Sequence, residues 1–243
     1  MSKPPPVLSF AAFFVVPLRA EAQELLREHD DGYEFEAAAL ADVNGDGVPD
    51  YALQRYDPKA KVNGVEVRGG KKGALIRAIP TPAPAGEDWS FGVALADAGD
   101  VDGVSDLLVG AMLAPDPART LVECGAAYVY SGSDGHLIRS LYGSADHEWF
   151  GTTLCGLDDV DGDGSADFLV ESRMRSGVTN PFVTAFSGAT GAVLYTVGDA
   201  QVPTRISDHD HDGIRDFAAI WTSANVYSGA TSALVQKIGR AHV

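Results

Sequence analysis

Residues 159–170 read Asp159-Val-Asp161-Gly-Asp163-Gly-Ser-Ala-Asp167-Phe-Leu-Val170, in which acidic and small residues alternate and then give way to an apolar run. Three similar segments occur elsewhere: Asp42-Val-Asn44-Gly-Asp46-Gly-Val-Pro-Asp50, Asp100-Val-Asp102-Gly-Val-Ser-Asp106 and Asp208-His-Asp210-His-Asp212-Gly-Ile-Arg-Asp216. They recur about every 50 to 60 residues, a spacing typical of a repeat architecture. In chain order we call them Asp loops one to four, residues 159–167 being loop three.

Each Asp loop leads directly into a short apolar run, which predicts a buried strand. The four runs are Tyr51-Ala-Leu53, Leu107-Leu-Val-Gly-Ala111, Phe168-Leu-Val170 and Phe217-Ala-Ala-Ile-Trp221. A second element then recurs, in which a strand enters a glycine-containing turn and a further strand follows, at residues 65–76, 128–138, 184–194 and 225–235. Glycine in these turns is expected to supply the positive φ that a hairpin needs.

The repeating unit therefore runs strand, Asp loop, strand and two-stranded hairpin, always in this order. Four antiparallel strands in about 50 to 60 residues make one blade of a β-propeller. A single sheet of this kind cannot bury both of its faces, so neighbouring blades have to stack to form a core. The sequence predicts an all-β fold with four visible blades, forming an open arc or part of a ring.

Two blades open with Phe-Gly, at Phe91-Gly92 and Phe150-Gly151, and Gly110-Ala111 ends the second strand of blade two. Together with the Asp loops, these residues resemble the FG-GAP repeats of the integrin alpha-chain propeller and of bacterial secreted proteins. Blade one departs from the pattern with Glu34-Phe35-Glu36 in place of Phe-Gly, and blade four lacks the signature. The resemblance covers about residues 33–239, with blades at 33–80, 89–143, 149–198 and 200–239 of a propeller domain at 23–239.

The Asp loops have the composition of a calcium site. Oxygen-bearing side chains at positions one, three, five and nine, with glycine at position six, bring several oxygens to the inside of a tight backbone. Ca²⁺ takes about six to eight hard oxygen ligands at flexible distances. The EF-hand loop begins similarly but closes with a glutamate at position twelve. Position twelve here is Leu53, Val170 or Ala219, inside an apolar run, so the aspartate at position nine must close the site.

The predicted Ca²⁺ ligands come from all four loops: Asp42, Asn44, Asp46, Asp50, Asp100, Asp102, Asp106, Asp159, Asp161, Asp163, Asp167, Asp208, Asp210, Asp212 and Asp216. The FG-GAP resemblance further implies a carbonyl ligand from position seven. Loop two is two residues shorter than the others, so its aspartates are not expected to reproduce the geometry of the full loops. Metal binding at loop two therefore stays open.

The net charge of the chain bears on whether nucleic acid could be a partner. The chain has 243 residues and a formal net charge of −16. A surface of this sign repels a phosphate backbone, which argues against nucleic acid. Of the 34 acidic residues, 14 lie in the Asp loops, so the negative charge is concentrated at the predicted cation sites.

The N-terminus has the features of a secretory signal peptide, because Lys3 is followed by an apolar stretch from Val7 to Leu18 and then by Ala20-Glu-Ala22. We predict cleavage after Ala22, which makes residues 1–22 the signal peptide and the mature protein secreted. The alternative is a buried N-terminal strand. Extracellular calcium is about millimolar and would fill even weak sites. The apolar stretch is too short to span a bilayer, and no later segment is long enough.

The state of the two cysteines and the origin of the last residues each have two possible interpretations. Cys124 and Cys155 are the only cysteines, and they could form a disulfide in a secreted protein or remain free and buried. Residues 238–243 match one reading frame of a sequencing adapter, which would make 240–243 a non-native tail, although Ile238-Gly239 also fits the blade pattern.

No catalytic signature is recognisable in the sequence, which contains no Gly-x-Ser-x-Gly, no His-Glu-x-x-His and no phosphate-binding Gly-x-x-x-x-Gly-Lys. The leading interpretation is a secreted calcium-binding propeller that acts as a scaffold or protein-recognition surface and not as an enzyme. The alternative is a carbohydrate-binding propeller, or the non-catalytic part of a truncated polysaccharide-acting enzyme. The expected partners are Ca²⁺ and an extracellular protein or glycan.

Overall fold

The computed structural model describes residues 36–57, 62–175 and 180–240. The predicted signal peptide at 1–22 and residues 241–243 of the predicted tail at 240–243 lie outside these residues, whereas Arg240 is the last residue of the final strand, β16 (Leu234–Arg240). Every regular element in the described part is a β-strand. The same residues contain no helix with the length and apolar character that a membrane crossing requires.

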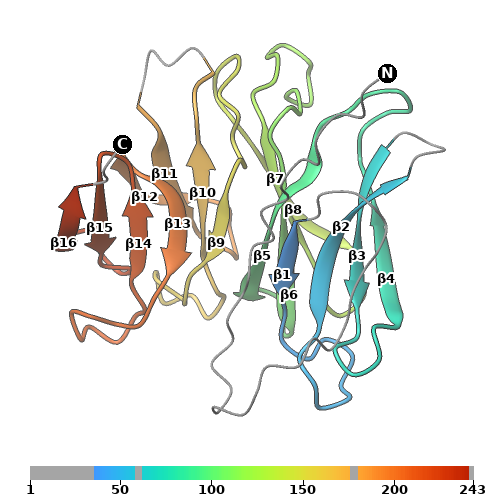
Figure 1. Ribbon diagram of the computed structural model, residues 1–243, viewed down its shortest axis with the longest axis horizontal. Helices are drawn as coiled ribbons and strands as arrows, with labels where there is room; N and C mark the ends of the chain where they lie inside the picture. The colour runs from blue at the N-terminus through green and yellow to red at the C-terminus, as the bar shows by residue number, and fades with distance from the viewer. Residues whose placement is uncertain (1–35, 58–61, 176–179, 241–243) are drawn as a thin grey trace, which may run out of the picture. The chain divides into compact units, whose positions relative to one another are not determined.

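The strands form four separate four-stranded sheets (Figure 1). Blade one consists of β1 (Ala37–Ala39), β2 (Tyr51–Asp57), β3 (Val62–Arg68) and β4 (Leu75–Pro80). Blade two consists of β5 (Phe91–Asp100), β6 (Ser105–Ala111), β7 (Ala126–Tyr130) and β8 (Leu137–Tyr142). Blade three consists of β9 (Leu154–Gly156), β10 (Phe168–Ser172), β11 (Phe182–Phe186) and β12 (Val193–Gly198). Blade four consists of β13 (Gln201–Arg205), β14 (Phe217–Ile220), β15 (Ser223–Tyr227) and β16 (Leu234–Arg240).

Within each blade, every strand pairs antiparallel with its neighbours in the sequence. The apolar run after each Asp loop is the second strand, and the glycine-containing turn joins the third strand to the fourth. The predicted all-β fold of propeller blades is therefore confirmed. Blades one and four form complete sheets although they lack the Phe-Gly signature, because the alternating apolar residues of their strands suffice to specify pairing.

The core lies between successive blades and is built by the two-residue period of the strands. Phe168 and Leu169 are adjacent in β10 and both are fully buried, yet they belong to different clusters. Phe168 packs with residues of blade two, and Leu169 packs with residues of blade four, since successive side chains of a strand point to opposite faces. Each inner blade is thus covered on both faces, as the stacking of repeats requires.

The Phe-Gly signature lies in this core. Phe91 is fully buried against blade one, and Phe150 is packed between blades two and three. Cys124 and Cys155 are buried and free, so the open question of a disulfide is answered against a bridge. Burial raises the pKa of both thiols to about 11, which makes them unreactive at neutral pH.

Candidate metal sites in the Asp loops

The four Asp loops occupy the same place in their blades. Each connects the first strand to the second, at the turns β1–β2, β5–β6, β9–β10 and β13–β14 (Figure 1). The last aspartate of each loop is buried, with 2% or less of its surface exposed, whereas the middle of each loop is exposed. Each loop therefore has an anchored end and a solvent-facing end.

The first aspartate of a loop shapes the exposed end. In loop three, Oδ1 of Asp159 accepts hydrogen bonds from the backbone N–H groups of Gly162 (2.8 Å) and Asp163 (3.1 Å), and Oδ2 accepts from Gly164 (2.9 Å). Gly162 and Gly164 have φ values of +77° and +94°, a conformation that glycine adopts without strain. Loop one repeats this arrangement around Asp42. The glycines of the motif are thus explained by the turn that wraps the first carboxylate.

The last aspartate of a loop joins it to the hairpin of the same blade. In loop three, Oδ2 of Asp167 accepts a hydrogen bond from the N–H of Val160 (2.6 Å), and Oδ1 accepts one from the N–H of Gly188 (2.9 Å). The same pair of bonds recurs at Asp50, Asp106 and Asp216. A buried carboxylate with both oxygens paired in this way fixes the loop relative to the sheet.

The first glycine of each hairpin turn allows the hairpin backbone to approach the backbone of the Asp loop closely. The sequence pattern alone did not reveal this role. A Cβ on Gly188 would lie 1.9 Å from the carbonyl oxygen of Ala166, and Gly70, Gly132 and Gly229 are equally crowded. Positive φ values fall on the later hairpin residues Gly73, Gly135, Gly191 and Ser232. The expected role of glycine in supplying positive φ is therefore correct for the second turn position and wrong for the first. The repeated Ser-Gly at residues 131–132, 187–188 and 228–229 was the available signal.

Three loops bring carboxylates together into groups that could hold a metal ion. In each group one oxygen from each residue lies within 4.8 Å of the others. The groups are Asp100, Asp102 and Asp106 in loop two, Asp159, Asp161 and Asp167 in loop three, and Asp208, Asp210 and Asp216 in loop four. Carboxylate oxygens at this separation repel one another and are the hard ligands that Ca²⁺ and Mg²⁺ prefer.

Loop two corrects an expectation from the sequence. Its aspartates were not expected to reproduce the geometry of the longer loops, yet Asp100, Asp102 and Asp106 form a group with the same spacing limit as those of loops three and four. The shorter sequence lacks only the residues at positions five and six. Removing them leaves the first, third and last carboxylates in place, because the last one is held by Val101 and Gly132.

The fifth-position aspartates lie outside these groups of three. Asp163 accepts a hydrogen bond from the hydroxyl of Ser187 (3.2 Å), and Asp212 accepts one from Ser228 (3.1 Å). Each also accepts a backbone hydrogen bond two residues further along the loop. Asp46 of loop one makes the corresponding backbone contact with Val48. In loops three and four the fifth carboxylate therefore links the exposed end of the loop to the hairpin.

Loop one differs because its third residue is an amide. Nδ2 of Asn44 donates to both carboxylate oxygens of Asp50, each at 3.0 Å, and its Oδ1 accepts from the N–H of Asp46. In loop three, Asp161 has a carboxylate at this position and would place a second negative charge beside Asp167. The amide satisfies Asp50 within the loop, so loop one carries less repulsion than the other three.

Two of the buried aspartates, Asp106 and Asp167, have a raised pKa in the metal-free chain. Burial raises the pKa of Asp106 to about 6, and the neighbouring carboxylate of Asp102 adds to the shift, while backbone hydrogen bonds oppose it. Burial likewise raises the pKa of Asp167. At the exposed end the direction reverses, because the hydrogen bond from the N–H of Gly47 lowers the pKa of Asp42.

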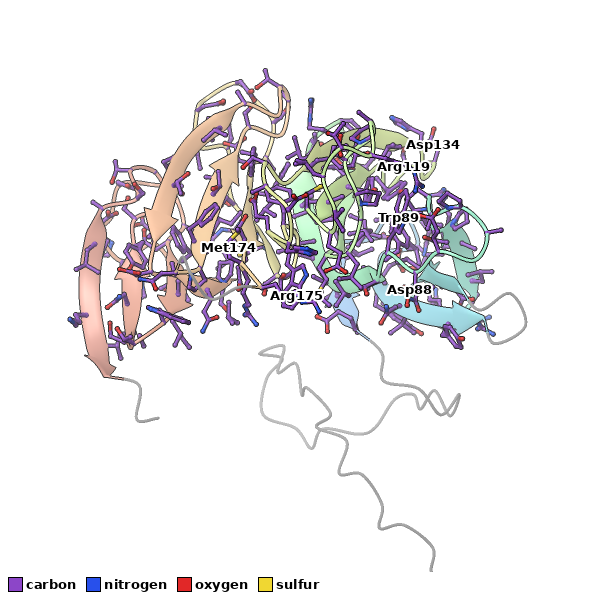
Figure 2. All side chains as sticks on the ribbon, turned by 90° about the horizontal axis from the view of Figure 1, so that it is seen from above. Asp88, Trp89, Arg119, Asp134, Met174 and Arg175 are labelled. Atoms are coloured by element: carbon purple, nitrogen blue, oxygen red, sulfur yellow. The ribbon has the colours of Figure 1, made fainter. Side chains whose placement is uncertain are left out.

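A second recurring cluster, of an arginine, a tryptophan and a glutamate, lies away from the Asp loops. We call it the Arg-Trp-Glu brace. Arg119 lies over the ring of Trp89 (Figure 2), with Cζ 5.9 Å from the ring centre. Both side chains donate hydrogen bonds to the carboxylate of Glu87. Blade three repeats the arrangement with Arg175, Trp149 and Glu123. Because the guanidinium covers the indole and the carboxylate is already paired, this brace is explained by packing and needs no ligand.

Comparison with known proteins supports the resemblance drawn from the motifs. No protein-family model matches the chain. Integrin alpha pat-2 of Caenorhabditis elegans is 33% identical over 181 residues, which cover 61% of this chain and 14% of that protein. The chain is similar to integrin alpha chains. Integrin alpha-5 of Xenopus laevis is 24% identical over 201 residues, covering 76% of this chain and 18% of the relative.

Mouse integrin alpha-E is 35% identical over 92 residues, covering 34% of this chain and 8% of the relative. The chain thus spans less than a fifth of the length of these integrin alpha chains. The likeness confirms the integrin-alpha-like character that Phe91-Gly92, Phe150-Gly151 and the Asp loops predicted, and it agrees with the four-blade fold.

Proposed function

We propose that this chain is a secreted calcium-binding propeller module that acts as a scaffold or protein-recognition surface. The observation that carries the proposal is the convergence of three carboxylates within 4.8 Å in each of loops two, three and four. Such groups are costly in a folded protein unless a cation offsets their repulsion.

The donor set favours calcium over other metals. All predicted ligands are carboxylate, amide or backbone oxygens, and no histidine nitrogen or thiolate belongs to the groups. Hard oxygen donors at flexible distances suit Ca²⁺, whereas Mg²⁺ requires near-ideal octahedral geometry. The first, third and last residues of each loop would hold the ion. The aspartates at position five and the carbonyl at position seven would complete the ligand shell.

Ion binding would stabilise the blades through the last aspartate. Asp167 is a member of the carboxylate group and also accepts the hydrogen bonds from Val160 and Gly188. A cation bound there would offset the repulsion between Asp167 and Asp161 and keep Asp167 ionised, so both hydrogen bonds of Asp167 would be retained. In this way calcium would keep the blade edges rigid enough to present a recognition surface.

The resemblance to integrin alpha chains favours protein recognition over catalysis. An extracellular setting, in which calcium is abundant, would keep the sites filled. The partner would be another extracellular protein. The carbohydrate-binding alternative is tested on a glycan array. Saturable binding of a sugar would favour that alternative over protein recognition.

The metal proposal is tested by thermal melting of the purified chain with EDTA and with about 1 mM CaCl₂ or MgCl₂. A ligand present at about 100 times its dissociation constant adds roughly 2.7 kcal/mol per site to the free energy of unfolding, so calcium should raise the Tm clearly. Asp161→Ala combined with Asp210→Ala should blunt the response, since each substitution removes one carboxylate from a group.

The matched control is Asp134→Ala, which removes an aspartate that is 67% exposed and belongs to no carboxylate group. This control should keep the full calcium response. An identical Tm in EDTA and in calcium, or an equal loss of response in the control, would reject calcium binding by the Asp loops.

A further inference from the structure

Asp loops two and three contact each other directly at the junction of blades two and three. The backbone N–H of Ala166 in loop three donates to the carbonyl oxygen of Asp100 in loop two at 2.7 Å. The hydroxyl of Ser165 donates to the carbonyl oxygen of Val101 at 3.1 Å. The approach is close, because a Cβ on Gly99 would lie 2.5 Å from the Cβ of Ala166. Two candidate cation sites are thus joined by two hydrogen bonds, which we call the interloop bonds.

The peptide group between Ser165 and Ala166 takes part in both a candidate site and the interloop contact. Its carbonyl is the position-seven group that would complete the ligand shell of loop three, and its N–H makes the bond to Asp100. A peptide group is planar and rigid, so an ion that fixes the carbonyl also fixes the direction of the N–H. Order imposed on loop three by an ion would therefore reach the first residue of loop two.

A second peptide group continues this connection inside loop two. The carbonyl of Asp100, which accepts from Ala166, belongs to the same peptide group as the N–H of Val101. That N–H donates to Oδ2 of Asp106 at 2.8 Å, and Asp106 belongs to the carboxylate group of loop two. Two rigid peptide groups in series therefore connect a proposed ligand of loop three with a proposed ligand of loop two.

The other two junctions differ at the corresponding position, the residue before the last aspartate. In loop two this residue is Ser105, whose hydroxyl donates to Asp97 of its own blade at 2.7 Å. In loop four it is Arg215, whose N–H donates to the carboxylate of Asp158 at 2.9 Å. Asp158 precedes loop three and contributes its side chain to this bond, not a peptide group. Among the junctions that the structure describes, the connection through peptide groups is therefore the one between loops two and three.

We propose that Asp loops two and three bind their cations cooperatively and that the interloop bonds carry the coupling. This inference rests on the proposed function, since it requires both loops to bind a cation. In the metal-free chain the carboxylates of each loop repel one another, and an ion has to order the loop that it enters. Once loop three is ordered, the interloop bonds hold Asp100 and Val101 in place, so the second ion has a smaller entropic cost to overcome.

Repulsion between the two ions acts against this coupling. At about 0.15 M salt the Debye length is about 8 Å, so charges at the exposed ends of the loops are screened from one another. The carboxylates of each loop would also offset the charge of the ion that they hold. The ordering effect should therefore prevail at this ionic strength. Coupling between two sites of a protein typically changes an affinity by about 5- to 150-fold.

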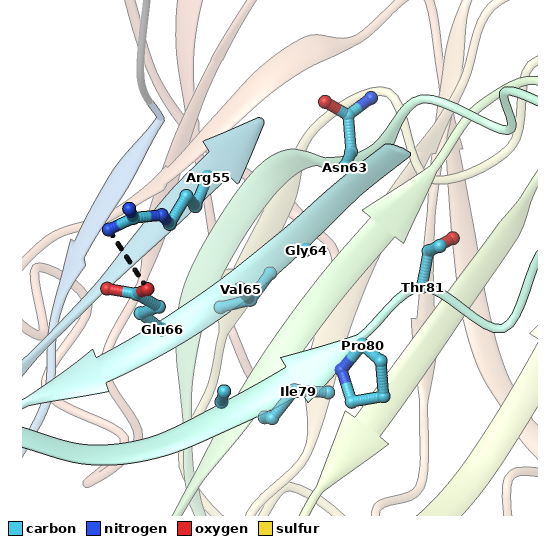
Figure 3. A pocket seen from close by; sticks show the side chains of 9 residues that line it. Arg55, Asn63, Gly64, Val65, Glu66, Ile79, Pro80 and Thr81 are labelled. Atoms are coloured by element: carbon cyan, nitrogen blue, oxygen red, sulfur yellow. Dashed lines mark ion pairs between the residues drawn. The ribbon is translucent and has the colours of Figure 1, made fainter. Parts of the chain in front are cut away.

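The hollow on blade one is a poor competitor for calcium. It has a volume of about 470 Å³ and lies beside β3 and β4 (Figure 3). Among the residues that line it, the carboxylate is that of Glu66, which forms ion pairs with Arg55 at 3.1 Å and with Arg68. Calcium added to the chain should therefore act at the Asp loops.

The test follows calcium binding at each loop separately, by ¹H–¹⁵N correlation NMR of the full chain in about 0.15 M NaCl. Gly103 and Gly164 serve as reporters, because the N–H of each bonds the first aspartate of its own loop. Asp161→Ala removes one carboxylate from the group of loop three. It should raise the calcium concentration that half-shifts the Gly103 signal by about fivefold or more. The matched control Asp210→Ala removes the same group from loop four and should leave the Gly103 midpoint unchanged.

Ser165→Ala tests the interloop bonds without any change of charge. It removes the hydroxyl bond to Val101 and leaves every carboxylate in place. Position seven of loops one and four is Val48 or Ile214, so the hydroxyl is no general part of the loop pattern. Ser165→Ala should therefore weaken the coupling, and Asp161→Ala should have a smaller effect on the Gly103 midpoint in this background than in the parent chain.

The outcomes separate the coupling from metal binding itself. A Gly103 midpoint that Asp161→Ala leaves unchanged or lowers would overturn the cooperative proposal and leave calcium binding intact. An effect of Asp161→Ala that Ser165→Ala leaves undiminished would likewise overturn it, because the interloop bonds would then not carry the coupling. If calcium shifted neither Gly103 nor Gly164, the proposed metal binding would be rejected and this inference with it.

Discussion

Asp167 accepts a hydrogen bond of 2.9 Å from the backbone N–H of Gly188, 21 residues further along the chain. This bond closes blade three, because the aspartate ends the Asp loop and the glycine begins the hairpin turn. The corresponding bond is present in all four blades, with lengths between 2.9 and 3.1 Å. The Asp loop is therefore part of the sheet architecture as well as a candidate metal site.

Gly188→Ala should destabilise the chain by about 2 to 4 kcal/mol, because the new Cβ would lie 1.9 Å from the carbonyl oxygen of Ala166. The backbone has to shift to relieve this contact, and the bond to Asp167 is lost with it. Urea denaturation gives the free energy of unfolding. Gly198→Ala is the control, since a Cβ added at Gly198 would meet no other atom within 4 Å, and it should change the free energy of unfolding by less than about 0.5 kcal/mol. Equal effects of the two substitutions would contradict the close-approach explanation.

Asn44→Asp should raise the calcium affinity of loop one. The amide nitrogen of Asn44 donates to Asp50, and a carboxylate in its place would replace that contact with repulsion and add a ligand oxygen. In EDTA the variant should therefore melt below the parent chain, and in calcium the gap should close or reverse. Isothermal titration calorimetry measures the affinity directly. A variant that is destabilised equally with and without calcium would show that residue 44 takes no part in binding.

The metal-free chain should become more stable as the pH falls from about 7 to 5. Burial raises the pKa of Asp106 to about 6, so the folded chain binds a proton in this range more readily than the unfolded chain does. The stabilisation from this group is complete below the ordinary pKa of aspartate and is lost as the pH rises through 6. Asp106→Asn should remove its share of the slope, on the order of 1 kcal/mol, in melts recorded in EDTA. A slope that the substitution leaves unchanged would assign the effect to other groups.

The strands that follow the Asp loops were predictable because two independent signals agreed, an apolar run and its position directly after a turn. Phe168-Leu-Val170 is apolar and follows a turn, and both of its faces proved to be buried. The candidate ligand residues of the Asp loops were likewise visible as a spacing pattern. The grouping of Asp100, Asp102 and Asp106 was not, because it depends on the anchoring of Asp106 by Gly132, which is 26 residues away. Long-range backbone contacts of this kind leave no local trace except the glycine itself.

The contact between blades two and three allows a comparison of Arg139, which bonds the next blade, with the residue at the same position of blade four. Arg139 donates to the carbonyl oxygens of Gly188 and Thr190, and Gln236 is the residue at the same position of blade four, where it is exposed. Arg139→Ala should lower the free energy of unfolding by about 1 to 3 kcal/mol, because the carbonyl groups lose a charged donor. Gln236→Ala should change it by less than about 0.5 kcal/mol. Urea denaturation of the two variants decides the matter, and an equal loss in both would mean that the fourth-strand side chains stabilise their own blade and not the junction.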